Sequence, residues 1–377
     1  MPWREASVNS ERCEFSRLAE AGELSMAELC RRFGISRPTG YLWLERWRQE
    51  GDAGLEDRSH RPHSFPQRMP RRIEKKVVKL RRKHPRWGGR KISAVLARSG
   101  VTPVPAPSTV TGILRRHGLL GEAPPPRDYV RFEAQVPNDL WQMDFKGWFS
   151  VADGGRCHPF GVLDDHSRFN LVLAACADQR TATVQYLLTG AFSRYGLPQR
   201  ILCDNGPPWG NNLHQPWTPL GVWLVDVGIK VIHSRPYHPQ TAGKQERFHL
   251  TLDWEVISTR KVWANHQQVQ AAFDQWRPIY NHQRPHDALE LAVPADRYRL
   301  SPRPYPDQVA PIEPDAYPDT YQVRKVTDAR LSYHGHLIRV PKAFNGRYVA
   351  LTPPGTDGTT EIRYRHQLIT TIQLPTP

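Results

Sequence analysis

The chain has 377 residues, of which 39% are hydrophobic and 24% are charged. This composition excludes a fully disordered chain and, at roughly 100–200 residues per domain, predicts two to four domains. A formal net charge of +15 favours a polyanionic partner such as nucleic acid, and most of it lies in residues 1–127, which hold 26 basic and 13 acidic side chains.

Membrane and disulfide-stabilised classes are disfavoured. The most hydrophobic window, residues 169–177, is far shorter than the roughly 20 residues of a bilayer-spanning helix, and charged residues interrupt the first 15 positions, where a signal peptide would lie. We therefore expect a cytoplasmic protein without membrane contact. The five cysteines are odd in number and form no Cys-x-x-Cys pair, so neither a disulfide framework nor a thiolate zinc site is indicated.

Residues 11–50 show the pattern of a helix-turn-helix DNA-binding domain. Gly34 and Ser36 mark the turn before the last of three helical runs, which are expected over 13–21, 26–33 and 37–49. The third run carries the candidate DNA-contacting residues Arg37, Thr39 and Arg46. We expect a small core from Leu29, Leu42 and Trp47. A three-helix protein-interaction module has the same pattern and stays open as the alternative.

A second basic unit follows between two linkers. Residues 51–70 are rich in Gly, Pro, Ser and His without periodicity, and residues 121–137 contain three consecutive prolines, so both segments are predicted linkers. Within 71–120, eleven of the 21 residues from Arg71 to Lys91 are Lys or Arg, and apolar residues recur at helical spacing. We expect a second helical DNA-binding unit here; a solvated charged helix face is the alternative.

Residues 138–300 alternate apolar strands and helices. Strands are expected over 141–151, 157–163, 169–175, 200–203 and 230–232, and helices over 181–195, 242–257 and 266–280. Three strands followed by helix and strand alternation predict an α/β domain with a mixed sheet. Residues 320–374 contain five short apolar segments separated by turns, which predict a small β-barrel. The predicted fold is therefore multidomain: all-α units, an α/β core and a β-barrel.

Three carboxylates of the α/β domain stand at strand ends or early in a helix. Asp144 lies within Trp-Gln-Met-Asp-Phe, Asp204 closes Ile-Leu-Cys-Asp, and Glu246 lies near the start of a helix. Mg²⁺ prefers oxygen ligands, commonly one or two carboxylates with waters and phosphate oxygens. Two such ions about 3.5–4 Å apart can stabilise both the attacking and the leaving oxygen of a displacement at phosphorus. With 37 acidic residues in the chain, such a triple also arises by chance.

Five motifs supply the context for these carboxylates. They are Trp-x-x-Asp at 141–144, Val-Leu-Asp-Asp-His-Ser-Arg at 162–168, Asp-Asn-Gly at 204–206, the run His-Ser-Arg-Pro-Tyr-His-Pro-Gln-Thr-Ala-Gly-Lys-Gln-Glu-Arg-Phe-His at 233–249, and Tyr-Asn-His-Gln-Arg-Pro-His-Asp-Ala-Leu at 280–289. Together the motifs resemble the integrase core of bacterial insertion-sequence transposases. That family is similar to retroviral integrases in its RNase H-like fold and its Asp-Asp-Glu metal triad. With the helix-turn-helix units, the resemblance extends over residues 10–300.

The resemblance implies that Asp144, Asp204 and Glu246 are catalytic residues that bind two Mg²⁺ or Mn²⁺ ions. It also implies double-stranded DNA partners, namely the element's terminal repeats and the target, and a homo-oligomer that holds two DNA ends in a synaptic complex. A bacterial, nucleoid-associated location follows. The interval between Asp204 and Glu246 is longer than is common in the family, and we expect the extra length within 207–226.

Several neighbouring residues have competing interpretations. Adjacent strand residues point to opposite faces, so Asp164 and Asp165 cannot both bind one metal, and we interpret them as hydrogen-bonding residues at a strand end. Lys244 and Arg247 flank Glu246 and are predicted to contact DNA; a charged helix surface is the alternative. For the histidines we predict DNA contact or packing rather than zinc binding: His233, His238, His249, His282 and His286.

The sequence thus predicts a DNA transposase that binds the terminal repeats of an insertion sequence. Its reactions would be metal-dependent cleavage at the 3′ end of the element and strand transfer into target DNA. Two alternatives remain: a site-specific nuclease of the same fold, and a catalytically inactive DNA-binding regulator, which the presence of all three carboxylates disfavours. For the carboxy-terminal module, multimerisation is as well supported as DNA binding through Arg339, Lys342, Arg347 and Arg363.

Overall fold

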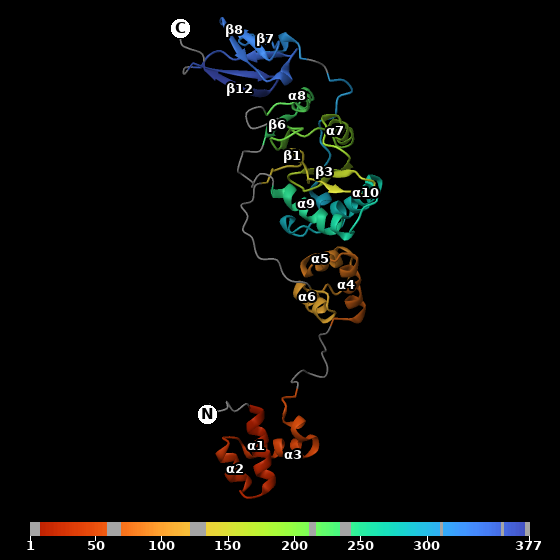
Figure 1. Cartoon of the computed structure of the whole chain (residues 1–377), viewed down its shortest axis with the longest axis vertical. Coiled ribbons are helices and arrows are strands. Elements are labelled where there is room, and N and C mark those ends of the chain that lie inside the picture. Colours follow the sequence, from red (N-terminus) through yellow and green to blue (C-terminus); the bar gives the residue numbers. More distant parts are fainter. Residues whose placement is uncertain are drawn as a thin grey trace. The chain divides into compact units, whose positions relative to one another are not determined.

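The computed structural model describes residues 8–58, 69–120, 133–210, 216–233, 243–309, 312–355 and 358–373. The chain divides into two compact units, residues 1–68 and 69–377, and each is described by itself (Figure 1). Both predicted linkers lie partly outside the described residues, and the predicted domain boundaries stay predictions. Among the described helices, none combines the length and the apolar character that a membrane crossing requires.

The first unit contains the predicted helix-turn-helix pattern. Its elements are α1 (Val8–Ala21), α2 (Met26–Arg32), α3 (Arg37–Glu50) and the 3-10 helix η1 (Gly51–Leu55). Ser25 and Ser36 cap α2 and α3, because their hydroxyls accept hydrogen bonds from the backbone N–H groups of Glu28 and Thr39. Between these helices Gly34 adopts a φ of +64°, which suits a glycine at a helix end.

The small core of this unit differs from the prediction at two of its three positions. Leu29 is fully buried, as predicted, but Leu42 is 49% exposed and Leu44 is buried instead. Trp47 is only partly buried and lines a surface pocket. Gly40 and Leu44, one helical turn apart, form the inner face of α3, which places Leu42 outside it. A Cβ atom at Gly40 would lie 2.6 Å from Cys30 Sγ, so the helices approach each other at this glycine.

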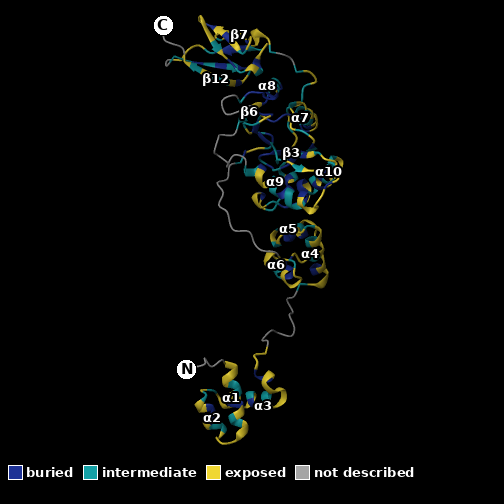
Figure 2. Ribbon diagram, viewed as in Figure 1, coloured by how far each residue is buried: buried dark blue, intermediate teal, exposed yellow. Residues whose placement is uncertain are grey.

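The second unit begins with the predicted second group of helices. These are α4 (Arg71–Lys83), α5 (Gly89–Arg98) and α6 (Pro107–Arg116). They enclose a core of their own, formed mainly by Ile73, Val77, Trp87, Ile92, Val110 and Ile113. Most basic residues of α4 are exposed, whereas Ile73 and Val77 are buried, so the amphipathic pattern in the sequence is confirmed. Figure 2 shows α4 with both exposed and buried positions.

The α/β domain has the predicted mixed sheet, with strand order β2-β3-β1-β5-β6 and with β4 paired to β3. The strands are β1 (Leu140–Phe145), β2 (Phe149–Ser150), β3 (Arg156–Asp164), β4 (Asn170–Cys176), β5 (Arg200–Cys203) and β6 (Lys230–His233). β1 is antiparallel to β3 and parallel to β5, and β5 is parallel to β6. The single strand predicted over 141–151 is two strands, because the chain turns at Gly147, where φ is +100°.

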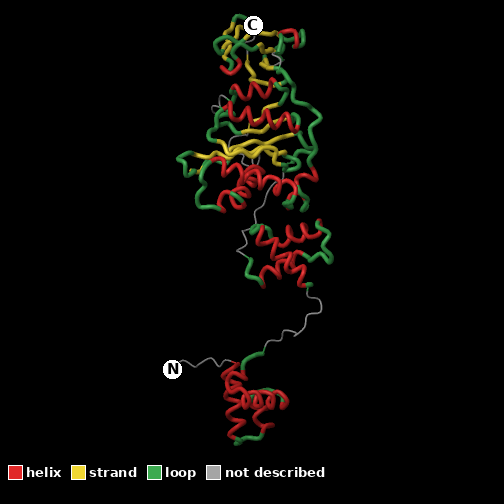
Figure 3. The backbone as a smooth tube through the Cα atoms, turned by 90° about the vertical axis from the view of Figure 1, so that its right-hand side faces the viewer, coloured by secondary structure: helices red, strands yellow, loops and turns green. Residues whose placement is uncertain are grey.

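Helices cover both faces of this sheet (Figure 3). Two of them, α7 (Thr181–Tyr195) and α8 (Pro219–Asp226), pack on the face that carries Trp141, Phe160 and Val162. On the opposite face, α9 (Gly243–Glu255) and α10 (His266–His282) pack against Leu163 and Leu173. The short helices η4 (Asp287–Leu289) and α11 (Pro294–Arg297) follow α10. This three-layer arrangement buries the sheet and leaves its strand ends at the surface.

The carboxy-terminal module consists of two open sheets, so the predicted closed barrel is not confirmed for the described residues. Four antiparallel strands form the order β12-β11-β10-β7, and β8 pairs with β9 in a separate hairpin. The strands are β7 (Gln322–Lys325), β8 (Arg330–Tyr333), β9 (His336–Arg339), β10 (Tyr348–Leu351), β11 (Thr359–Tyr364) and β12 (Gln367–Gln373). The module packs on the α/β domain, because Phe344 contacts Trp217 with a ring-centroid distance of 5.3 Å.

Candidate active site

The parallel pairing of β1 and β5 brings two of the predicted carboxylates together. Leu140 pairs with Arg200 and Gln142 with Leu202, and extending this register by two residues brings Asp144 level with Asp204, just after the end of β5. Neighbouring strands are separated by about 4.8 Å, so the two residues lie side by side at the carboxyl ends of two parallel strands. Asp204 follows the last residue of β5 and is exposed to solvent, whereas Asp144 is partly buried.

Glu246 lies in the first turn of α9, whose start is attached to the sheet beside Asp144. The buried Gln245 side chain donates hydrogen bonds of 2.9 Å to the carbonyls of Gln142 in β1 and Gly161 in β3. Gly161 pairs with Asp144, and its missing side chain leaves room for Phe248 of α9, whose Cε1 would be 3.0 Å from an added Cβ. The helix that carries Glu246 therefore packs directly over the strand position next to Asp144.

The electrostatics couple all three predicted carboxylates. Burial and the neighbouring charges of Asp204 and then Glu246 raise the pKa of Asp144 to about 7. Although Asp204 is exposed as a residue, partial desolvation of its carboxyl group raises its pKa, and the hydrogen bond of 3.0 Å that Oδ1 accepts from the Gly206 N–H acts in the opposite direction. His249 of α9 also lies near Asp144, with 3.8 Å between Nδ1 and Oδ2, and burial lowers the pKa of His249 to about 4, so it is neutral at pH 7.

This arrangement fits a divalent cation in its chemistry. Asp204 and Glu246 raise the pKa of Asp144, so their negative charges act on the Asp144 carboxyl group, and a cation bound there relieves the repulsion. The donors are carboxylate oxygens, which Mg²⁺ and Mn²⁺ prefer. Within the ranges that the structure describes, no three His, Cys, Asp or Glu side chains form a complete metal-binding group, so the three-carboxylate metal site stays a prediction.

Asp164 and Asp165 are hydrogen-bonding residues, as predicted. Both are fully buried. Asp164 accepts hydrogen bonds from the backbone of Asn138 and from Ser167. Asp165 accepts hydrogen bonds from the Ala134 N–H and the Gln142 amide, and it forms an ion pair with Lys244.

The residues predicted to contact DNA differ in their surroundings. Lys244 is only 15% exposed and its ammonium group contacts Asp165, whereas Arg247 is exposed. In the first unit, Thr39 hydrogen-bonds to the Ser36 hydroxyl, the Arg46 guanidinium lies 4.9 Å from the Trp43 ring, and Arg37 is exposed at the start of α3. Their DNA contacts stay predictions. His238 lies outside the described residues.

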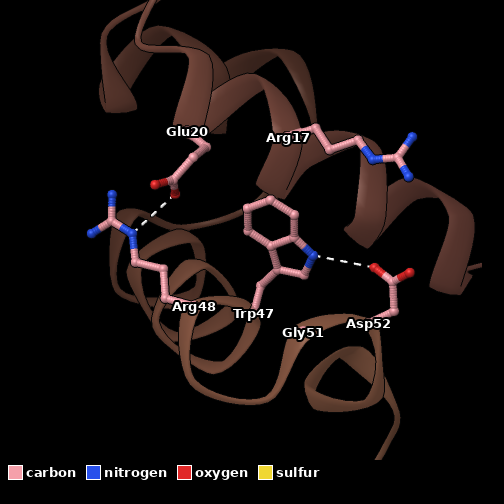
Figure 4. A pocket seen from close by; sticks show the side chains of 6 residues that line it. All are labelled: Arg17, Glu20, Trp47, Arg48, Gly51 and Asp52. Atoms are coloured by element: carbon pink, nitrogen blue, oxygen red, sulfur yellow. Dashed lines mark hydrogen bonds and ion pairs between the residues drawn. The ribbon is translucent and has the colours of Figure 1, made fainter.

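A shallow pocket in the first unit is a separate feature (Figure 4). It lies between α1 and α3, and Trp47 forms its centre. The Trp47 indole N–H donates to Asp52, and Arg48 forms an ion pair with Glu20 at 3.0 Å. These contacts join the helices across the pocket, so we assign it a structural role.

Sequence reasoning missed Gln142, Gln245 and Gly161, which build the site without being carboxylates. Gln142 is the polar residue of an otherwise apolar stretch of β1, which is the one local signal for a buried hydrogen-bonding role. Gln245 and Gly161 lack such a signal, because they act through partners 84 or more residues away in the chain.

Comparison with known protein families agrees with this organisation. Two family models, both described as "Integrase core domain", match residues 134–239 and 227–294. A helix-turn-helix domain matches 11–63, a homeodomain-like domain matches 39–114, and the C-terminal domain of IS481 family transposases matches 321–377. The helix-turn-helix domains indicate that the chain binds DNA.

Individual relatives come from insertion elements and retroviruses. An uncharacterized 39.2 kDa protein of insertion element IS476 from Xanthomonas euvesicatoria is 28% identical over 43% of this chain and 44% of its own length. An uncharacterized 31.7 kDa protein of insertion element IS407 from Burkholderia multivorans is 23% identical over 59% of this chain and 78% of its own length. The Gag-Pro-Pol polyprotein of simian retrovirus SRV-1 is 29% identical over 37% of this chain.

The chain spans 44% of the IS476 protein and 7% of the retroviral polyprotein, so these relatives do not define its activity as a whole. The domain matches are more informative, because they follow one another along the chain in the order of its structural parts: helix-turn-helix, integrase core and transposase carboxy-terminal domain. The domain matches and the insertion-element relatives together support a DDE-type insertion-sequence transposase with an integrase-like core.

Proposed function

We propose that this protein binds the terminal repeats of an insertion sequence, cleaves the element at its 3′ ends and joins those ends to target DNA. The observation that carries the proposal is the position of Asp144 level with Asp204 on parallel strands, with Glu246 on the helix packed beside them. The family supports phosphodiester chemistry at this place, since the integrase core domain includes all three residues.

The two reactions share one chemical step. In the first, water attacks a phosphodiester at the end of the element, which forms one P–O bond, breaks another and leaves a free 3′-hydroxyl. In the second, that hydroxyl attacks a phosphodiester of the target and displaces its 3′-oxygen. Negative charge develops at phosphorus in both reactions, so one preorganised site can serve both.

The divalent cations that such a core requires would be held by Asp144, Asp204 and Glu246. When bound, Mg²⁺ or Mn²⁺ supplies charge stabilisation for the attacking and leaving oxygens. The protein's own part is orientation: β1 and β5 fix the two aspartates, and α9 fixes the glutamate. His249 is neutral at pH 7, so it leaves the negative charge of the carboxylates uncompensated and available to a cation.

DNA recognition is assigned to the basic helices. Arg37, Thr39 and Arg46 lie on α3, the second helix of the helix-turn-helix pattern, which is the helix that enters the major groove in such domains. Exposed lysines of α4 such as Lys76 would contact phosphates without reading sequence. Arg37→Ala is expected to weaken binding to the terminal repeat about 10-fold or more and to reduce its preference over random DNA.

Lys76→Ala serves as the comparison for Arg37→Ala. It should weaken binding to both DNAs equally and lower the slope of log K against log salt by about one. Fluorescence anisotropy at several salt concentrations measures both effects. Equal losses on the two DNAs for Arg37→Ala would contradict a sequence-reading role for α3.

The catalytic proposal is tested with DNA that ends in the element's terminal repeat, incubated with the protein and Mg²⁺ or Mn²⁺. Joined products identify a transposase, nicks alone identify a nuclease, and binding without cleavage identifies a regulator. Asp144→Asn, Asp204→Asn and Glu246→Gln are each expected to abolish cleavage and to leave binding of the DNA end nearly unchanged. Loss of end binding in these variants would show that the carboxylates are structural.

A further inference from the structure

A buried charge pair lies beside the catalytic carboxylates and is not part of them. Asp165 is fully buried at the turn after β3, and the Lys244 side chain that contacts it is 15% exposed. A buried carboxylate is unfavourable unless a cation and hydrogen-bond donors compensate it. Asp165 has both, because the Ala134 N–H donates to Oδ2 at 2.7 Å and the Gln142 amide donates to Oδ1 at 2.6 Å.

The same network holds the first turn of α9. Lys244 connects this turn to the end of β3, and the next residue, Gln245, donates to the carbonyls of Gln142 and Gly161. Gln142 belongs to both parts, since its side chain donates to Asp165 and its carbonyl accepts from Gln245. Strands β1 and β3 are thereby tied to the two residues that immediately precede Glu246.

We propose that Lys244 and Gln245 are positioning residues that, through Asp165 and the carbonyls of Gln142 and Gly161, hold the Glu246 carboxylate next to Asp144. This inference rests on the proposed function, because it gives Glu246 a metal-binding role. It replaces the DNA contact predicted for Lys244: the ammonium group is engaged within the protein, and its removal acts on the metal site rather than on DNA affinity.

The first test is direct binding of Mn²⁺ alone to the full-length protein, measured by electron paramagnetic resonance. Lys244→Met removes the charge and keeps the length of the side chain, and Gln245→Leu removes both hydrogen bonds. Changes in residues that orient metal ligands typically weaken metal affinity 10–100-fold. Each variant is therefore expected to weaken Mn²⁺ binding at least 10-fold, whereas Lys244→Arg, which keeps a positive charge for Asp165, should weaken it less than Lys244→Met does.

The matched control is Lys261→Met, which makes the same change at an exposed lysine of the same domain and should bind Mn²⁺ like wild type. Thermal unfolding of all variants checks that they are folded. If Lys244→Met does not fold, Gln245→Leu still tests the inference, because it removes the two hydrogen bonds that hold the same turn to β1 and β3.

The second test separates positioning from DNA contact. In end cleavage, a positioning role lowers kcat of Lys244→Met at least 10-fold and leaves KM for the DNA end and the salt dependence of binding unchanged. A DNA contact would instead raise KM, lower the salt slope by about one and leave Mn²⁺ affinity intact, and that result would overturn the inference. Wild-type protein that neither binds Mn²⁺ nor cleaves would refute the proposed function itself, whereas active wild type with unaffected variants would refute the positioning role alone.

Discussion

At the scale of single residues, the candidate active site is a place where function opposes stability. Burial and the negative charges of Asp204 and Glu246 raise the pKa of Asp144 to about 7. Because its pKa in the unfolded chain is near 3.8, folding favours the protonated form. The stability that this group contributes is therefore fully present below about pH 4 and is lost as the pH rises through 7.

Asp144→Asn should consequently stabilise the metal-free protein at high pH. Asparagine cannot ionise, so the variant does not lose this stability between pH 5 and 8. The full shift would correspond to about 4 kcal/mol, and the partial exposure of the side chain reduces the expected gain at pH 8 to about 1–2 kcal/mol. In thermal melts with EDTA the difference in Tm should widen from pH 5 to pH 8 and narrow when Mg²⁺ is added. If the Tm of the variant and of the wild type changes with pH in the same way, the charges of Asp204 and Glu246 do not act on Asp144 as inferred.

The residues of the site differ in how far the sequence predicts them. Asp144, Asp204 and Glu246 are picked out by motif resemblance and by their places at strand ends and in a helix. The charge of Lys244 predicts a DNA contact, which stays a prediction, and the structure adds an ion pair with Asp165 that the sequence does not indicate. That pairing depends on the turn after β3 meeting the start of α9, a long-range contact that local pattern does not encode.

At the scale of elements, local signals were sufficient for helices and insufficient for sheet closure. Ser36, which is predicted to lie in the turn before the third helical run, caps α3, and Ser25 caps α2 in the same way, because a cap acts within a few residues. The strand predicted over 141–151 is broken, since its apolar pattern continues across a turn at Gly147. Whether β7–β12 close into a barrel depends on pairing between distant strands, and the described sheets are open.

The contact between α9 and β3 provides a test at this scale. A methyl group at Gly161 would stand 3.0 Å from the buried Phe248 ring, so Gly161→Ala must displace the ring or the helix. Overpacking of this kind destabilises a protein by about 1–3 kcal/mol. Because Glu246 lies on the displaced helix, end cleavage should fall at least 10-fold; urea unfolding and the cleavage assay measure the two effects.

Gly190 is the matched control for Gly161. It lies within α7, is exposed, and has no atom within 4 Å of an added Cβ. Gly190→Ala should therefore stabilise the protein by about 0.5–1 kcal/mol through helix propensity and leave cleavage unchanged. If Gly161→Ala keeps the stability and the activity of the wild type, α9 does not need to approach β3 closely at this position.

At the scale of the second unit, the carboxy-terminal module is fixed to the α/β domain by a polar centre. Asp226, at the end of α8, is 5% exposed and contacts Arg347 at 2.9 Å and Arg365 at 3.3 Å, and the Tyr364 hydroxyl donates to it. Gln367 also accepts a hydrogen bond from the Val231 N–H of β6. One continuous hydrophobic cluster surrounds these contacts, so the module and the α/β domain are expected to unfold together.

Asp226→Asn tests that coupling, with the exposed Asp307→Asn as its control. The substitution leaves Arg347 and Arg365 without their buried charged partner. Because both arginines are partly exposed, we expect the free energy of unfolding to fall by about 2–3 kcal/mol, which is less than the full value for a buried ion pair. Urea unfolding followed by tryptophan fluorescence should show a lower midpoint for Asp226→Asn only, and limited proteolysis should separate the module from the domain faster.

Cleavage of end DNA by Asp226→Asn should also weaken, since the module supports β6, which pairs with the strand that presents Asp204. If Asp226→Asn behaves like Asp307→Asn in all three measurements, the module is an independent appendage and its contact with α8 has no role in shaping the active site.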